Sequence, residues 1–109
     1  SKKERLTGAK NFIRVYQKGK RIKLPGLTII VARNCLPYCR IGISVGRKIG
    51  GATKRNRAKR LIRELFRTNK QIFPPGHDLV FLPYRKFFYL DWNELKSNLV
   101  KAFEASNRC

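Results

Sequence analysis

The sequence has 109 residues, a length that suits a single domain with one hydrophobic core. Hydrophobic residues make up 42% of the chain, which is too apolar for a disordered basic tail. Lysine and arginine number 26 against six aspartate and glutamate residues, a net charge of +20 that a compact monomer normally tolerates only beside a polyanion.

The first half of the chain predicts a helix followed by strands. Apolar residues recur at spacings of three and four over residues 9–18, with Thr7 as a possible cap and Gly19 as a stop. Residues 21–24 are extended at best. Residues 27–33 are rich in β-branched side chains and predict a buried strand.

The middle of the chain predicts a hairpin and a basic helix. Residues 34–39 contain a proline and resemble a hairpin connection to a strand at 41–45. A basic glycine-rich loop at 46–53 follows, and Thr53 is placed to cap the next helix. An apolar stripe identifies that helix: Ala58, Leu61, Ile62, Leu65 and Phe66.

The last third predicts a strand and a closing helix. Pro74, Pro75 and Gly76 end the basic helix, and residues 78–83 form a strand. The final helix starts at Asp91, which forms a capping box with Glu94, and it carries four residues inward: Trp92, Leu95, Leu99 and Phe103.

This order predicts one α+β domain over residues 1–109, with residues 1–6 flexible. We expect the helices to cover one face of a sheet and to leave the other face free. The unit from residue 41 to residue 83 is a strand-helix-strand crossover, for which a right-handed connection is the general expectation.

The charge is concentrated where it could hold an anion. Between Glu4 and Glu64 there is no carboxylate, while the interval contains 17 lysine or arginine residues. An ordinary solvated surface mixes both signs, so a nucleic acid partner is favoured. On the basic helix Arg55, Lys59 and Arg63 are spaced four residues apart, with Arg60 and Arg67 on an adjoining strip, and the N–H groups of the first turn can bind phosphate.

The sequence is poor material for a protein nuclease. Hydrolysis of a phosphodiester needs clustered metal-binding carboxylates or a paired acid and base, and six acidic residues with one histidine do not supply them. We therefore expect neither a catalytic residue nor a metal site. Cys35, Cys39 and Cys109 are expected to be free thiols, because their spacing with His77 matches no common zinc pattern.

Residues 42–64, GISVGRKIGGATKRNRAKRLIRE, resemble the signature of the bacterial ribonuclease P protein, including its Arg-Asn-Arg motif at residues 55–57. The match is long and specific. Weaker agreement extends outward, since residues 11–19 resemble the first helix of that family and residues 77–80 its last strand. The resemblance spans most of the chain.

The resemblance implies a two-layer sandwich of order α-β-β-β-α-β-α with a left-handed crossover, which replaces the right-handed default. It implies that the active site and its Mg²⁺ ions belong to the catalytic RNA, that the protein binds no cofactor alone, and that the complex matures the 5′ end of tRNA by endonucleolytic cleavage. The residues that would then bind the catalytic RNA are Arg47, Lys48, Lys54, Arg55, Asn56, Arg57, Lys59, Arg60 and Arg63.

The resemblance also implies a cleft for the single-stranded leader of precursor tRNA, between the first helix and the sheet. Its candidates are Phe12 and Tyr16 on the helix and Thr28 and Ile30 on the strand, with Lys10 and Arg14 for the leader phosphates. Without the resemblance, Phe12 and Tyr16 are better interpreted as core residues. With it, partial exposure for base stacking is favoured.

Two other classes are alternatives, of which the first would share the charge and the mixed fold. A ribosomal or other structural RNA-binding protein would associate with ribosomal particles and would not stimulate tRNA processing. A DNA-binding repressor is disfavoured, because residues 46–53 do not prepare a helix-turn-helix. No apolar run approaches the roughly 20 residues that cross a bilayer, so we expect a cytoplasmic protein. We predict no obligate protein partner.

Overall fold

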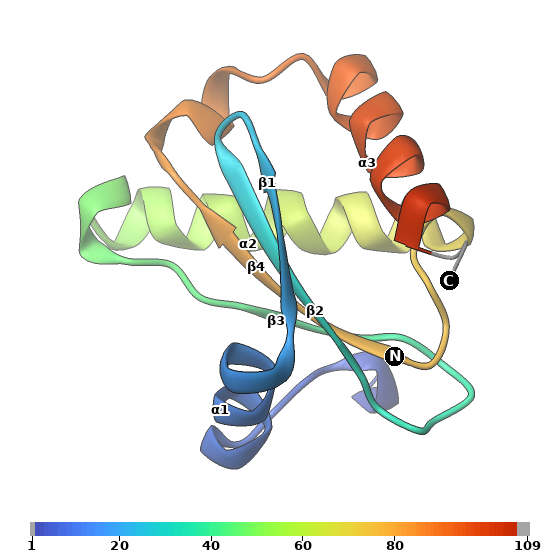
Figure 1. Cartoon of the computed structure of the whole chain (residues 1–109). Helices are drawn as coiled ribbons and strands as arrows, with labels where there is room; N and C mark the ends of the chain where they lie inside the picture. Colours follow the sequence, from blue (N-terminus) through green and yellow to red (C-terminus); the bar gives the residue numbers. More distant parts are fainter. Residues whose placement is uncertain (1, 107–109) are drawn as a thin grey trace.

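The computed structural model describes residues 2–106 and contains a four-stranded mixed sheet with three helices (Figure 1). The helices and strands are α1 (Ala9–Lys18), β1 (Lys20–Leu24), β2 (Leu27–Arg33), β3 (Arg40–Ile43), α2 (Ala52–Thr68), β4 (His77–Pro83) and α3 (Trp92–Ser106). Short 3-10 turns at Lys2–Glu4, Arg47–Ile49, Lys70–Ile72 and Arg85–Tyr89 complete the chain. The predicted bounds of α1 and β2 are confirmed. No helix among the described residues is long and apolar enough to span a membrane.

The strands lie in the order β1-β2-β4-β3, with β2 antiparallel to both its neighbours and β3 parallel to β4. The predicted hairpin at residues 34–39 is therefore wrong, because β4 pairs between β2 and β3. The extended segment before Pro25 is a full strand that pairs with β2 across a tight turn. Along the chain, α2 connects the parallel strands β3 and β4, and Figure 1 shows it behind the sheet. This makes the crossover left-handed, as the resemblance implies.

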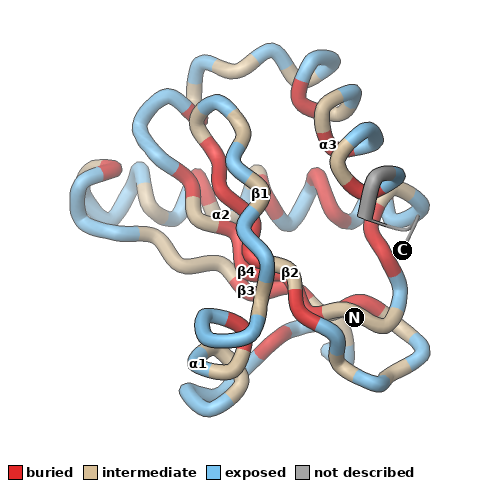
Figure 2. The backbone as a smooth tube through the Cα atoms, in the orientation of Figure 1, coloured by how far each residue is buried: buried red, intermediate tan, exposed pale blue. Residues whose placement is uncertain are grey.

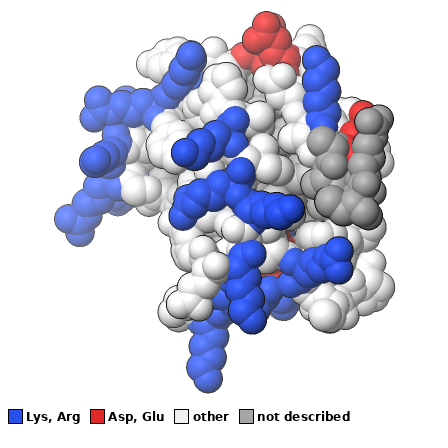
Figure 3. All heavy atoms as spheres, viewed as in Figure 1, with Lys and Arg blue, Asp and Glu red and all other residues white. Residues whose placement is uncertain are grey.

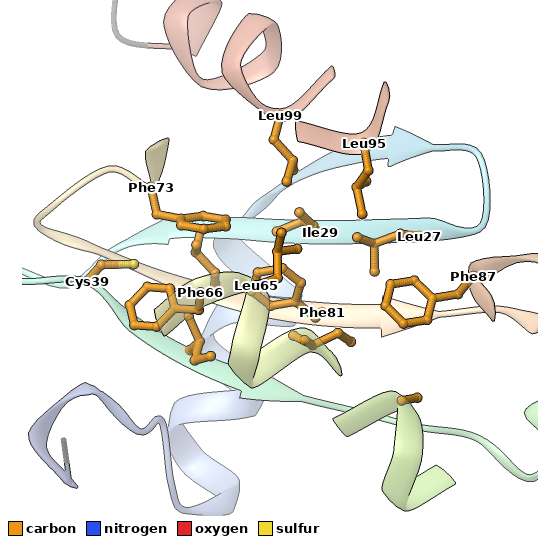
Figure 4. Packing of buried hydrophobic residues seen from close by; sticks show 14 of the residues in the cluster. Leu27, Ile29, Cys39, Leu65, Phe66, Phe73, Phe81, Phe87, Leu95 and Leu99 are labelled. Carbon is orange, nitrogen blue, oxygen red and sulfur yellow. The ribbon is translucent and has the colours of Figure 1, made fainter. Parts of the chain in front are cut away.

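The main core lies between one face of the sheet and the pair α2 and α3. Alternation along β2 and β4 turns every second residue to this face, where Leu27, Ile29, Leu79 and Phe81 are fully buried. Figure 4 shows the side chains of α2 and α3 meeting these strands from above and in front, and Figure 2 shows the buried positions gathered along the sheet. Phe81 packs edge-on against Phe73, at 6.0 Å between ring centroids.

The opposite face of the sheet is covered in part by α1, which corrects the expectation of a free face. A second and smaller cluster forms there from five buried residues: Leu6, Val15, Ile30, Ala32 and Val80. The segment before α1, for which flexibility is expected, contacts the edge of the sheet. Arg5 bridges to Ile41 beside β3, and Leu6 is buried and donates its N–H to the Ile41 carbonyl oxygen at 2.8 Å. Residue 1 lies outside the described residues.

The helix ends follow the predictions unevenly. The Asp91 carboxylate accepts hydrogen bonds from the N–H groups of Asn93 and Glu94 and so caps α3, as predicted. The two threonines predicted as caps do not act as caps, because α1 begins after Gly8 and α2 after Gly51. Thr53 lies inside the first turn of α2.

The turn between β1 and β2 makes Gly26 the most demanding glycine of the fold. Its φ is +74°, and a Cβ built there would lie 2.8 Å from the Phe87 nitrogen. Gly26→Ala should lower the free energy of unfolding by about 1 to 3 kcal/mol in urea denaturation, because both the backbone conformation and the contact are unfavourable. Gly46→Ala is the matched control, since Gly46 has a φ of −78° and no heavy atom of the described chain lies within 4 Å of the added Cβ. Equal stability of the two variants would contradict the strain assigned to Gly26.

Candidate nucleic-acid interface

Cationic side chains dominate the surface around α1, β1 and the start of α2. In the view of Figure 3 they cover these elements, while acidic side chains lie at the margin. The nine residues predicted to bind the catalytic RNA all keep accessible surface. Seven are exposed, and Arg55 and Lys59 are half-buried.

Along α2, apolar residues that pack on the core and basic residues that face solvent lie on different sides of the helix. Its apolar stripe faces the core through Ala58, Ile62, Leu65 and Phe66, so its cationic side chains are left on the remaining surface. Arg57 lies over the Phe88 ring, 5.8 Å from the centroid, which fixes part of its side chain. These contacts place a rigid core behind an exposed cationic helix.

The start of α2 is suited to anions. Gly51 precedes the helix in an extended conformation, and no acidic residue occupies the first turn. The hydrogen bond from Arg55 N–H to the Gly51 carbonyl oxygen, at 3.0 Å, is the first of the helix. The N–H groups of Ala52, Thr53 and Lys54 therefore stand at the positive end of the helix dipole, beside three basic side chains: Lys54, Arg55 and Arg57.

A hollow of about 310 Å³ lies at the outer edge of β3. Its apolar lining includes the rings of Phe12 and Phe66, and its basic lining includes Lys59 and Arg63 of α2 and Arg5 of the N-terminal segment. Phe12 reaches this edge because Gly42 has no side chain: a Cβ there would lie 2.5 Å from the Phe12 ring. The hollow thus brings together Phe12, which is predicted to contact the leader, with Lys59 and Arg63, which are predicted to bind the catalytic RNA.

The predicted leader-cleft residues do not all line one accessible surface. Tyr16 is 37% exposed and Lys10 is exposed, as a ligand contact requires. Ile30 is fully buried beneath α1 and belongs to the second hydrophobic cluster, so it offers no accessible surface to a ligand in this structure. Thr28 is 4% exposed, and its hydroxyl oxygen accepts a hydrogen bond from the Tyr84 hydroxyl at 3.2 Å.

Three accessible residues of the same sheet face were missed. Arg21 pairs with Ile30 and Lys23 with Thr28 across the β1–β2 ladder, so both point to the face that carries α1. Tyr84 is 52% exposed and adjoins Thr28. The alternation of basic and apolar residues over 20–24 could have identified the two cations. No local pattern indicates Tyr84.

Arg14 is partly exposed, but its guanidinium is bound to other groups of the protein. Its guanidinium forms an ion pair with Asp78 and donates to the Arg33 carbonyl oxygen at 2.8 Å. Arg40 also binds Asp78 through two hydrogen bonds of 2.8 Å each, and the Asn34 amide donates to the same carboxylate at 2.9 Å. Asp78 is 0% exposed, so one buried carboxylate joins α1, β3 and the end of β2 to β4.

The partners of Asp78 also set its protonation. Burial raises the pKa of this carboxyl, but the hydrogen bonds from Arg40 and Asn34 and the charges of Arg40 and Arg14 together outweigh it, so the pKa lies below the usual 3.8. Asp78 is therefore ionised in the folded protein at neutral pH.

The other acidic and thiol groups are dispersed. Glu4 pairs with Lys70, Glu64 pairs with Arg67 on the surface of α2, and Asp91 caps α3. Burial, followed by the charges of Asp78 and Glu4, raises the pKa of the Cys39 thiol to about 12, so it is protonated at neutral pH. Over residues 2–106, no three histidine, cysteine or acidic side chains gather to hold a metal ion. Cys109 lies outside the described residues.

Comparison with known proteins identifies relatives along almost the whole chain. The family model "Ribonuclease P" matches residues 1–107. A ribonuclease P protein component from Petrotoga mobilis is 42% identical over 104 residues, covering 92% of this chain and 88% of its own. The structure of the ribonuclease P protein from Thermotoga maritima is similar at 34% identity, with a TM-score of 0.78 over 91% of this chain and 94% of its own. That from Staphylococcus aureus is 25% identical, with a TM-score of 0.77 over 94% of each chain.

The Asp78 cluster predicts a dependence of stability on pH. Because the folded pKa lies below the usual value, the ionised carboxylate stabilises the protein above pH 3.8, and this contribution is lost as the pH falls through the folded pKa. Asp78→Asn leaves two arginines without their buried partner and should lower the free energy of unfolding by about 3 to 5 kcal/mol at pH 7. The deficit relative to wild type should shrink below pH 3.8. Urea titrations across that range measure it, and a deficit independent of pH would remove Asp78 as its cause.

Proposed function

Because this chain belongs to the bacterial ribonuclease P protein family, we propose that it binds both the catalytic RNA of ribonuclease P and the 5′ leader of precursor tRNA. It thereby promotes the endonucleolytic maturation of the tRNA 5′ end. The observation that carries this proposal is the presence of two separate basic surfaces, one on α2 and one on the sheet face that carries α1.

The α2 surface is suited to structured RNA. Nine residues between Arg47 and Arg63 present cations and one amide on a rigid helix and the turn before it. Arginine binds phosphate with two hydrogen bonds in a fixed geometry, and the first turn of α2 adds N–H donors. Asn56 is exposed between Arg55 and Arg57 and can contact a ribose or a base edge. We assign this surface to the catalytic RNA.

The α1 face is suited to an unpaired strand. Tyr16 offers a partly exposed ring on which any base can stack, and Phe12 offers a second ring toward the edge of β3. Lys10 on α1 and Arg21 and Lys23 on β1 supply cations for the phosphates between the bases. A duplex would expose no base faces to these rings. We assign this face to the single-stranded leader.

In this proposal the RNA carries out the chemistry. No three acidic side chains of the described residues gather at one place, and those of Glu4, Glu64 and Asp78 are each paired with a basic side chain. They do not fit a magnesium site, so the Mg²⁺ ions of the holoenzyme would be bound by the RNA. The protein supplies binding and charge neutralisation. We place the complex in the cytoplasm, where the tRNA precursors of a bacterium are made.

The protein alone should not cleave precursor tRNA, because it lacks the carboxylate cluster or acid–base pair that the reaction needs. Protein freed of RNA and of contaminating nucleases should leave the substrate intact at any magnesium concentration. Addition of a bacterial catalytic RNA should restore cleavage at low magnesium. Cleavage by the protein alone that is lost in Glu64→Gln would overturn this division of labour.

Replacing both Arg55 and Arg57 with alanine should weaken assembly with the catalytic RNA. Each lost phosphate contact should also reduce the slope of log affinity against log salt by about 1. Lys96→Ala with Lys101→Ala is the matched control, because it removes the same charge from α3. An equal effect of the two double variants would mean that net charge, and not the α2 surface, binds the RNA.

Replacing Tyr16 with alanine should weaken binding of tRNA that carries a leader by about 1 to 3 kcal/mol, because one base loses its stacking partner. Mature tRNA should bind with nearly unchanged affinity. Tyr89→Ala is the control, since Tyr89 is an 84% exposed tyrosine on another segment. Circular dichroism should show both variants folded, and equal losses for both tRNAs would place the leader elsewhere.

A further inference from the structure

The helix that carries the proposed leader contacts cannot hold itself in place. α1 has 10 residues, and it contains three basic residues and no acidic one. Among the described residues no side chain caps its start at Gly8. Isolated helices shorter than about 12 to 15 residues are marginal in water. The position of α1 therefore depends on its contacts with the sheet.

The apolar contacts of α1 are few. Val15 alone among the residues of α1, all of which the structure describes, is buried. It belongs to the small cluster on the far face of the sheet, which shares no residue with the main core of α2 and α3. The partly buried Phe12 also packs against this cluster and beside Gly42. These two apolar side chains hold the helix against the sheet, and a further attachment helps to set how the helix is turned about its own axis.

Arg14 supplies this further attachment. It reaches Asp78 on β4 and the Arg33 carbonyl oxygen at the end of β2, so it is bound to two strands at once. The acceptor is itself fixed, because Arg40 holds Asp78 with two hydrogen bonds and Asn34 with a third. Arg14 stands two residues from Phe12 and two from Tyr16. Successive residues of a helix are turned by about 100° about its axis. Once the direction of the Arg14 side chain is fixed, the directions of Phe12 and Tyr16 are therefore fixed too.

We propose that Asp78 is a positioning residue for leader recognition: through Arg14 it sets the orientation of α1 on the sheet and so holds Phe12 and Tyr16 in place for the leader. This inference rests on the proposed function. Asp78 is fully buried and does not touch the RNA. The link from Asp78 to the proposed leader contacts runs through Arg14 and α1, whereas α2 packs on the other face of the sheet against the main core.

A direct role for Arg14 is the alternative, in which its guanidinium contacts a leader phosphate. The two roles predict opposite effects of Asp78→Asn. If Arg14 binds phosphate directly, loss of Asp78 frees the guanidinium, and leader binding is retained or strengthened. If Asp78 positions α1, loss of either partner weakens leader binding, and loss of both is no worse than loss of one.

The experiment compares Asp78→Asn, Arg14→Gln and the double variant in the assembled holoenzyme, where RNA binding stabilises the folded protein. Glu104→Gln is the control, since it neutralises an exposed carboxylate on α3. Affinities are measured for tRNA with and without a leader. We expect each single variant and the double variant to lose at least fivefold for the leader-carrying tRNA, with mature tRNA unchanged, an unchanged salt slope and full binding of the catalytic RNA.

Amide hydrogen exchange gives an independent readout. In Arg14→Gln protection should fall in α1 and persist in α2, α3 and β4, and in Asp78→Asn the loss should be largest in α1. If Asp78→Asn does not assemble, Arg14→Gln decides by the same measurements, because it leaves Asp78 paired with Arg40.

Three results would overturn the inference. The first is an Asp78→Asn variant that keeps its affinity for leader-carrying tRNA. The second is a reduced salt slope in Arg14→Gln together with losses of affinity that add in the double variant, and the third is an equal loss of affinity for both tRNAs in folded variants. Wild-type holoenzyme that binds both tRNAs equally would contradict the proposed function instead. In that case the exchange measurement still tests whether Asp78 fixes α1.

Discussion

The arrangement of this protein depends on one buried carboxylate in a chain of net charge +20. Asp78 is fully buried and binds the side chains of Arg14, Arg40 and Asn34. A buried charge is tolerated only when it is paired and hydrogen-bonded, so its partners cannot move independently. The cluster therefore ties α1 and β3 to the edge where β2 ends and β4 begins. The cluster also pairs the charges of Arg14 and Arg40 with a carboxylate within the protein, whereas most of the other basic residues lie on the surface.

The sheet divides the molecule into a side that holds the main core and a side that carries the proposed leader contacts. On one face the apolar residues of four strands meet α2 and α3 and form the main core. On the other face the cluster beneath α1 is small, and Arg21 and Lys23 remain exposed beside it. Because the main core lies on the α2 and α3 side, the face that carries α1 can hold cations and partly exposed rings without loss of the main core. The helix α2 is divided in the same way, because its apolar side chains face the core and its basic side chains lie on the opposite surface.

The edge of β3 is where the two surfaces approach one another. Gly42 lets the Phe12 ring cross the edge strand, and Lys59 and Arg63 of α2 line the same hollow. An RNA bound along α2 and a strand bound along α1 would then share one border of the protein. Under the proposed function, such proximity would bring the leader close to the catalytic RNA. It also gives Gly42 a packing role that its place in the family motif alone does not explain.

The sequence by itself determined the elements, the charge and the family. The bounds of α1 and β2, the apolar stripe of α2 and the Asp91 cap follow from local periodicity and side-chain chemistry, and the Arg-Asn-Arg motif indicated an RNA partner. The left-handed crossover came from the resemblance, since periodicity says nothing about handedness. Only the tertiary structure placed β4 between β2 and β3, put α1 on the far face, buried Ile30 and turned Arg14 inward to Asp78. Alternation along a strand tells which residues share a face, but which element covers that face depends on contacts between residues far apart in the chain.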